Sequence, residues 1–383
     1  MNPGPGMFER PASGTRAILV QVDFGQGGIE ERLSEVSLLA QSAGAMVVGV
    51  VQGRRQAPDP AHFVGKGKAE EIGLVAQMND ADIVIFNHDI TAAQQRNLER
   101  KLDCRVVDRS ALILDIFALR AKSHEGKLQV ELAQLQHLST RLVRGWTHLE
   151  RQKGGIGLRG PGEKQLETDR RLLGERVKLL KDRLAKLERQ RSVRRRARER
   201  RDVLSVSLVG YTNAGKSTLF NALTKAGAYA ADQLFATLDT TSRRLFLGEA
   251  GNIVLSDTVG FIRDLPHSLV AAFHATLEET ASADLLLHVV DSASEDREGQ
   301  IAAVNSVLEE IGAGTLPQIQ IWNKIDATLA SAEVQQDACG KITRVLLSAR
   351  TGEGLELLRQ VLTDVALEHK AALAAASESP EPF

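Results

Sequence analysis

The segment Gly-Tyr-Thr-Asn-Ala-Gly-Lys-Ser-Thr at 210–218 constrains the fold of this chain more than any other feature. It matches the pattern G-x-x-x-x-G-K-[ST], in which backbone N–H groups surround phosphate oxygens. A β-branched run at 203–209 precedes it, and a helix-compatible run at 216–225 follows it. A helix that starts at such a loop directs the positive end of its dipole at a bound anion. This context predicts a strand, a phosphate-binding loop and a helix, and not a simple glycine turn.

The residues of this loop predict how a nucleotide is held. Lys216 is expected to neutralise the β- and γ-phosphates, and the Ser217 hydroxyl is expected to bind Mg²⁺. Backbone groups supply the other contacts. The predicted nucleotide-binding residues of the segment are Gly210, Asn213, Ala214, Gly215, Lys216, Ser217 and Thr218.

A second motif, Asp-Thr-Val-Gly at 257–260, closes the apolar run at 253–256. A carboxylate at a strand end, followed three residues later by a glycine N–H, suits an Mg²⁺ contact and a γ-phosphate sensor. We therefore predict that Asp257 contacts the metal and that Gly260 senses the γ-phosphate. Gly260 and Lys216 are both predicted to be catalytic residues.

Two further motifs indicate which base is bound. Asn323, Lys324 and Asp326 follow a strand-like run at 318–322, and Ser348 and Ala349 follow another at 343–347. The Asp326 carboxylate can accept hydrogen bonds from N1–H and the 2-amino group of guanine, which adenine does not offer. Ser348 and Ala349 can lend a backbone N–H to the base. The motifs predict GTP and GDP as ligands and hydrolysis of GTP as the reaction.

The region from about 16 to 122 alternates apolar runs, at 17–22, 46–51, 83–86 and 105–107, with helical periodicity. This alternation predicts a parallel sheet covered by helices on both faces. Ligands of such folds favour the carboxyl ends of the strands, so the segments 65–68 (Gly-Lys-Gly-Lys) and 87–89 (Asn-His-Asp) are possible contacts. The spacing of the first is not that of a phosphate loop, and a tight turn is the favoured interpretation. We interpret His88 as a loop histidine.

Two heptad patterns flank a glycine-rich segment and predict an antiparallel helical hairpin. Their apolar positions are Leu128, Leu132, Leu135, Leu142, Trp146 and Leu149 before the segment, and Leu166, Leu173, Val177, Leu180, Leu184 and Leu187 after it. The tip, from Lys153 to Glu163, holds five glycines, a proline and an arginine. Between 141 and 201 there are 21 lysines and arginines against eight acidic residues, a net +13, whereas the whole chain carries −1. A basic arm on an acidic remainder indicates a polyanionic partner such as RNA. A solvated basic face remains the alternative, and the run at 189–201 could contact RNA or transmit nucleotide state.

Composition narrows the class of protein. Hydrophobic residues make up 43% of the chain, and the two cysteines lie in different predicted domains, so neither a disulfide framework nor a zinc site is indicated. No apolar run approaches the roughly 20 residues of a membrane span. The segment 1–15 lacks the apolar core of a signal peptide. We expect a cytoplasmic monomer.

The four nucleotide motifs, in this order, resemble the G1, G3, G4 and G5 elements of GTPases. With the region before them, to about residue 370, they resemble the HflX family of ribosome-associated GTPases. The most specific match runs from Gly154 to Glu163 and on through 165–169; the segments 64–68 and 235–239 also fit. One departure is Thr240, where the family usually has proline.

The resemblance implies an architecture. It consists of a flexible 1–15, an N-terminal parallel α/β domain (16–125), a helical hairpin with a basic linker (126–201), a Ras-like P-loop GTPase domain (202–370) and a disordered tail (371–383). It also implies that Thr237 completes the Mg²⁺ shell in the GTP state, although Thr240 and Thr241 compete on spacing alone. In GTPases with asparagine at the loop position of Asn213, the side chain can help to hold a K⁺ beside the phosphates.

Three functions compete. The first, which the resemblance favours, is a factor that binds the large ribosomal subunit, with rRNA near the tip, and splits or rescues stalled ribosomes. The second is a signalling switch that binds proteins only, and the third is an RNA-remodelling ATPase with an extra nucleotide site in the N-terminal domain. Phe261 stands where many GTPases place the glutamine that orients the attacking water, so we expect slow intrinsic hydrolysis.

Overall fold

The computed structural model describes residues 14–25, 27–145, 161–199, 203–224, 234–266, 269 and 274–378. The chain divides into two compact units, 1–184 and 185–383. Most of the predicted hairpin tip, residues 153–160, lies outside the described residues, as do 1–13 and 379–383. No described helix is long and apolar enough to cross a membrane.

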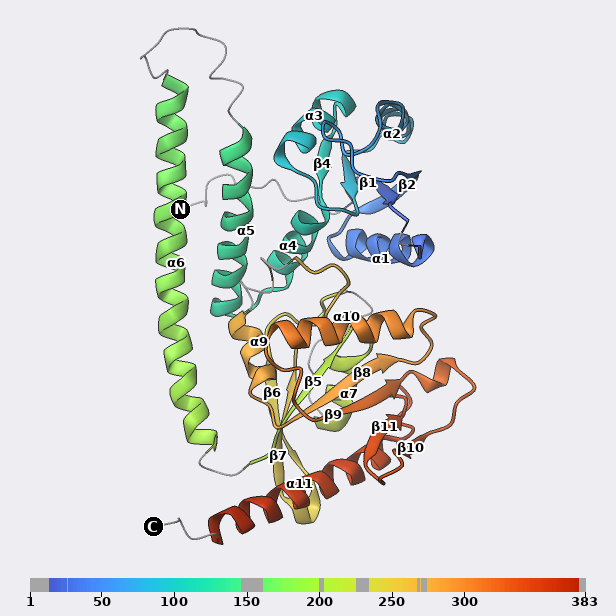
Figure 1. Ribbon diagram of the computed structural model, residues 1–383, viewed down its shortest axis with the longest axis vertical. Helices are drawn as coiled ribbons and strands as arrows, with labels where there is room; N and C mark the ends of the chain where they lie inside the picture. The colour runs from blue at the N-terminus through green and yellow to red at the C-terminus, as the bar shows by residue number, and fades with distance from the viewer. Residues whose placement is uncertain are drawn as a thin grey trace. The chain divides into compact units, whose positions relative to one another are not determined.

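The first unit begins with a four-stranded parallel sheet in the order β2-β1-β3-β4 (Figure 1). Its strands and helices are β1 (Arg16–Asp23), α1 (Ile29–Ser42), β2 (Met46–Arg54), α2 (Lys66–Met78), β3 (Ile83–Phe86), α3 (Ala92–Leu102), β4 (Arg105–Val107), α4 (Arg109–Arg120) and α5 (His124–Gly145). Ile18, Val20 and Val22 of β1 pack against α2 and α3 in one core. The alternating β and α order agrees with the prediction, because strands buried on both faces read as apolar runs.

The helical hairpin follows this sheet. Helix α5 contacts α3 and α4, and α6 (Pro161–Glu199) lies beside it (Figure 1). The predicted heptad positions Leu128, Leu132 and Leu135 of α5 are buried, as are Leu173 and Leu180 of α6. Buried leucines at alternating steps of three and four residues hold two antiparallel helices together.

The second unit carries a seven-stranded sheet in the order β10-β11-β9-β8-β5-β7-β6. Its elements are β5 (Ser205–Gly210), α7 (Lys216–Thr224), β6 (Thr241–Phe246), η1 (Gly248–Ala250), β7 (Asn252–Asp257), α9 (His274–Ala281), β8 (Leu285–Asp291), α10 (Arg297–Glu310), β9 (Gln318–Asn323), η2 (Ile325–Ala327), β10 (Glu333–Gln336), β11 (Ile342–Leu346) and α11 (Leu355–Glu378). Only the edge strands β6 and β10 pair antiparallel among the described strands. Parallel central strands bring the ends of β5, β7, β8 and β9 to one edge of the sheet.

Three expectations were wrong in detail. Helix α11 continues to Glu378 where we expected disorder from 371, because its last turns are rich in alanine, the strongest helix former. The segment 65–68 is the start of α2 and not a tight turn, since N–H groups of a first helical turn need no intrahelical partner. The predicted tip ends earlier, because Pro161 begins α6 and a proline is well suited to the first helical position.

His88 is also more than a loop histidine. Its Nε2 accepts a hydrogen bond from the backbone N–H of Val22 at 3.0 Å, and its ring packs against Phe24 and Phe63. It therefore joins the loop after β3 to the end of β1, a structural role.

Candidate nucleotide-binding site

The predicted phosphate loop connects β5 to α7, as expected from its flanking runs. Gly210 and Gly215 have φ of +149° and +92°, and Asn213 has φ of +61°. A side chain at Gly210 would collide with the carbonyl of Val289, and one at Gly215 with the amide of Asn323. Both glycines are therefore required by the backbone as well as by the predicted ligand.

Lys216 is enclosed by this loop. Its side chain is 5% exposed, and its Nζ donates to the carbonyl oxygens of Gly210 and Tyr211 at 3.0 and 2.7 Å. Burial lowers the pKa of Lys216 to about 8, and the charge of Asp257 opposes this shift. A desolvated ammonium held by neutral carbonyls interacts strongly with an anion that enters the loop.

Ser217, Thr237 and Asp257 meet next to this lysine. The Ser217 hydroxyl donates to Asp257 Oδ2 at 2.7 Å and lies 2.7 Å from Thr237 Oγ1, which donates to the same carboxylate oxygen at 2.9 Å. The Asp257 side chain is 1% exposed, and burial raises its pKa, with the Ser217 and Lys216 contacts opposing. Its Oδ1 has no hydrogen-bond partner. Two hydroxyls and a carboxylate with an unpaired buried oxygen form a hard donor set that fits Mg²⁺.

The structure separates two of the three candidate threonines, Thr237 and Thr241. Thr237 contacts Ser217 and Asp257 through its side chain. Thr241 instead begins β6, where it pairs with Asp257 in the antiparallel ladder. One cavity is lined both by the phosphate loop and by residues 235–237. This arrangement favours Thr237 over Thr241 as the third oxygen donor.

The base-side motifs are connected to the phosphate loop through Asn323. Its Nδ2 donates to the Ala214 carbonyl at 2.9 Å, and its Oδ1 accepts from the Ala349 N–H at 2.9 Å. Asp326 accepts from the Ser348 hydroxyl at 2.6 Å. Lys324 has a left-handed backbone, with φ of +68°, and its Nζ lies 2.7 Å from Asp291 Oδ2. All the predicted base-binding residues thus gather at the ends of β9 and β11.

The segment after β7 is attached to the phosphate loop by backbone hydrogen bonds. Phe261 N–H donates to Gly210 O at 3.1 Å, and Thr212 N–H donates to Phe261 O at 2.7 Å. A side chain at Gly260 would lie 2.9 Å from Thr212 Cα and 3.0 Å from Lys216 Nζ. Gly260 therefore lies directly over the loop, where its predicted γ-phosphate role requires it.

Sequence reasoning missed Tyr211, in the phosphate loop, and Arg263, in the segment after β7. The Tyr211 hydroxyl accepts a hydrogen bond from the Arg263 N–H at 2.8 Å, and the Arg263 guanidinium pairs with Asp296. Tyr211 occupies a variable position of the loop pattern, so no signal in one sequence marks it. Phe261 is fully buried, and its side chain can neither donate to nor accept from a water.

His288, in the middle of β8, gives a pH prediction. It is 1% exposed and its Nδ1 has no hydrogen-bond partner. Burial lowers its pKa to about 4; Lys216 adds to the shift and Gln318 opposes it. Between pH 6.5 and 4 the unfolded chain then binds a proton that the folded chain does not. The free energy of unfolding should therefore fall by about 3 kcal/mol as pH drops through this window.

This prediction can be checked by urea unfolding of a Trp146→Phe chain, in which Trp322, in the same sheet as His288, is the remaining fluorophore. His288→Gln should reduce the loss of stability between pH 6.5 and 4. His124→Gln, at an exposed position, should leave it unchanged. An equal loss in wild type and His288→Gln would contradict the assignment.

Comparison with known proteins accounts for both units. Family models match residues 30–118 (GTP-binding GTPase N-terminal), 120–198 (GTP-binding GTPase Middle Region) and 205–324 (50S ribosome-binding GTPase). The chain is 57% identical over 360 residues to GTPase HflX of Escherichia coli, covering 94% of this chain and 84% of that one. It is 48% identical over 356 residues to GTPase HflX of Magnetococcus marinus, covering 92% and 82%.

A solved structure supports the fold. The crystal structure of SsGBP in complex with GDP has a TM-score of 0.50 at 23% sequence identity, covering 92% of this chain and 99% of that one. The predicted α/β fold with a P-loop GTPase domain is confirmed, and so is the family resemblance. Because the sequence identity to these two relatives extends over most of both chains, this protein belongs to the HflX family of GTPases.

Proposed function

We propose that this GTPase is a factor that binds the large ribosomal subunit in its GTP state and splits or rescues stalled ribosomes. The observation that carries the proposal is a helical hairpin, rich in Lys and Arg, whose second helix, α6, leads along the chain into the nucleotide-binding unit. RNA phosphates attract such an arm through counterion release. The description of the 205–324 model as a 50S ribosome-binding GTPase supports the same partner.

We assign the site residues as follows. Lys216 and the loop backbone bind the β- and γ-phosphates, and Ser217, Thr237 and Asp257 hold Mg²⁺, which supplies positive charge to the phosphates when bound. The Gly260 N–H contacts the γ-phosphate, and Asp326 reads the guanine edge. The proximity of these groups supports the assignment, because phosphoryl transfer depends on positioning and charge stabilisation.

Phe261 leaves the attacking water without a side-chain partner, because its ring is buried and apolar. Intrinsic GTP turnover is therefore slow, and the ribosomal partner positions the attacking water that Phe261 cannot hold. Phosphate release should accelerate when large subunits are added. Equal rates with and without them would remove this part of the proposal.

Asn213 gives a prediction about monovalent ions. It lines the cavity beside Lys216 and Ser217, and we propose that its side-chain oxygen helps to hold a K⁺ against the phosphates. Charge stabilisation of this kind is worth about 10²-fold or more in kcat. GTP turnover should accordingly be higher in K⁺ than in Na⁺ at equal ionic strength, and Asn213→Ala should abolish the difference. Equal wild-type rates in the two salts would end the idea.

The proposed function is tested by co-sedimentation with ribosomes and isolated subunits. The chain is assayed with a non-hydrolysable GTP analogue, with GDP and without nucleotide, beside a variant in which 154–162 is replaced by a short turn. We expect binding to the large subunit that needs both the GTP state and the glycine-rich segment. Absence of binding in every state would overturn the ribosomal function and leave a switch with protein partners.

A further inference from the structure

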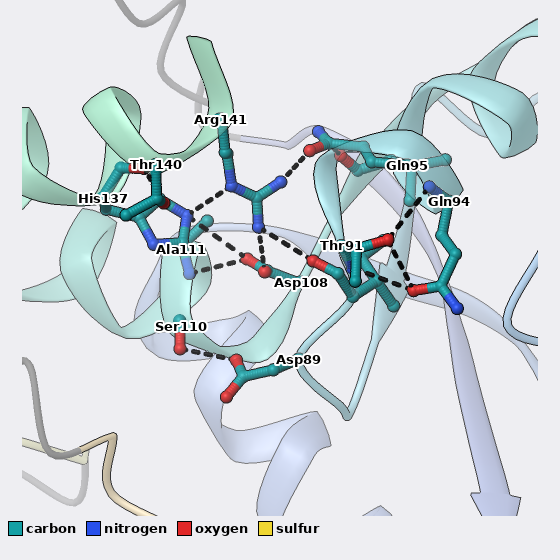
Figure 2. Close-up of polar contacts among 12 residues, drawn as sticks. Asp89, Thr91, Gln94, Gln95, Asp108, Ser110, Ala111, His137, Thr140 and Arg141 are labelled. Carbon is teal, nitrogen blue, oxygen red and sulfur yellow. Dashed lines mark hydrogen bonds and ion pairs between the residues drawn. The ribbon is translucent and has the colours of Figure 1, made fainter. Parts of the chain in front are cut away.

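Asp108 is a buried carboxylate with two separate tasks. It lies directly after β4, and its side chain is 2% exposed. Its Oδ1 accepts a hydrogen bond from the Ala111 N–H at 2.9 Å, which caps the N-terminus of α4. Its Oδ2 pairs with the guanidinium of Arg141, which comes from α5 (Figure 2). One carboxylate thus belongs both to the sheet domain and to the helical hairpin.

Arg141 also contacts the other loops at this edge of the sheet. Its guanidinium donates to Gln95 of α3 and to the carbonyl of Ile90, in the loop after β3, the latter at 3.4 Å (Figure 2). Its Nε donates to His137 Nε2 at 2.8 Å. The two terminal nitrogens of the guanidinium therefore connect α5 to α3, to the loop after β3 and to Asp108, the residue that caps α4, while Nε donates within α5 itself.

This arrangement defines geometry more than it adds stability. A desolvated ion pair with further hydrogen bonds fixes the orientation of its two elements, although it contributes little net free energy against an apolar alternative. By contrast, Arg176 of α6 and Glu131 of α5 form an exposed pair, 44% and 37% exposed. Exposed pairs of this kind are worth little, which makes Arg176 a matched control on the same hairpin.

The position of Arg141 gives the pair its consequence. It lies four residues, about one turn, before Gly145, the last described residue of α5. The described end of α5 is therefore fixed to the sheet domain. We propose that the Asp108–Arg141 pair, together with Gln95, is a clasp that fixes the helical hairpin to the sheet domain, so that the hairpin is presented to the large subunit in one orientation. Arg141 is a positioning residue, and the proposal rests on the proposed ribosomal function.

Substitutions can separate positioning from folding. Arg141→Met keeps the apolar stem but leaves Asp108 buried without its cation, which is strongly destabilising by itself. Asp108→Asn removes the charge and keeps a good N-cap acceptor for α4. The double variant Asp108→Asn/Arg141→Met has no unpaired buried charge, so its stability should recover while the clasp stays broken. Arg176→Met is the control.

The orientation of the hairpin is measured by electron–electron distance measurements between spin labels. The labels are placed at Met78→Cys on α2 and Leu172→Cys on α6, both well exposed at 83% and 52%, with Cys104 and Cys339 replaced by alanine. The second readout is the affinity for isolated large subunits with a non-hydrolysable GTP analogue. GTP turnover without ribosomes is the check that the nucleotide site is intact.

We expect the double variant to show a wild-type unfolding midpoint and wild-type turnover without ribosomes, with a widened distance distribution. If the competent orientation falls to a tenth of the population, the affinity for large subunits falls about tenfold. Arg176→Met should match wild type in every measurement. A wild-type distance distribution in the double variant would overturn the proposal, and so would a widened one with unchanged affinity. Failure of wild type itself to bind subunits would overturn the ribosomal function, while the distance measurement would still decide the existence of the clasp.

Discussion

Replacing Asp326 with asparagine should shift the ratio of affinities for GTP and xanthosine triphosphate by about 10⁴-fold in favour of the xanthine nucleotide. The carboxylate presents two acceptors, which match the N1–H and 2-amino donors of guanine. An asparagine presents one acceptor and one donor, which match N1–H and the C2 carbonyl of xanthine. Asp326 is exposed, and a base that covers it without matching its hydrogen-bonding groups is bound weakly, because a polar group then loses water without gaining a partner.

The local structure should survive this substitution. Asp326 accepts from the Ser348 hydroxyl, and the side-chain carbonyl of asparagine can accept the same hydrogen bond. A matched control is Asp291→Asn, which removes the carboxylate held by Lys324 beside the same motif. It should change both affinities by a similar factor and leave their ratio unaltered. Calorimetric titration with the two nucleotides measures the ratio, and an unchanged ratio for Asp326→Asn would show that Asp326 does not read the base.

Local pattern was sufficient for most elements of both units. The apolar runs at 83–86 and 105–107 coincide with β3 and β4. Of the described heptad leucines, Leu128, Leu132, Leu135, Leu173 and Leu180 are buried as predicted, whereas Leu184 and Leu187 are half-buried. Strands buried on both faces and helices with one apolar stripe leave periodic signals that a single sequence carries. The phosphate loop was equally recognisable in the sequence, because its pattern requires glycine at two positions where a side chain would collide. These are Gly210, next to the Val289 carbonyl, and Gly215, next to the Asn323 amide.

Contacts between distant segments left no such signal. Asn323 was predicted to bind the base, yet nothing in the sequence indicated that its amide also joins Ala214 to Ala349. The pairing of Asp108 with Arg141 is equally invisible, because the sequence around each residue does not identify a partner 33 residues away. Such partners are set by tertiary packing and not by local periodicity. The end of helix α11 was predicted wrongly for a related reason. A composition of alanine, serine and glutamate is compatible with both helix and disorder, and the sequence alone does not decide between them.

Replacing Lys216 with methionine should lower GTP turnover by about 10²- to 10³-fold while leaving the fold intact. The ammonium is desolvated and donates to the carbonyl oxygens of Gly210 and Tyr211. Burial lowers the pKa of Lys216 to about 8 and so disfavours the charged form. Removal of the charge therefore takes away phosphate stabilisation, and it relieves a burial penalty at the same time.

The opposite signs of these two effects make the experiment decisive. Lys216→Met should keep or raise the unfolding midpoint while GTP turnover collapses, whereas Lys341→Met, at an exposed position of the same unit, should change neither. A loss of turnover that followed a loss of stability would mean that Lys216 acts through folding and not on the phosphates. The same variant tests for a second catalytic site. Because Lys216 belongs to the nucleotide loop of the second unit, ATP turnover that survives Lys216→Met would have to come from elsewhere in the chain. The N-terminal sheet would then be the candidate location of that site.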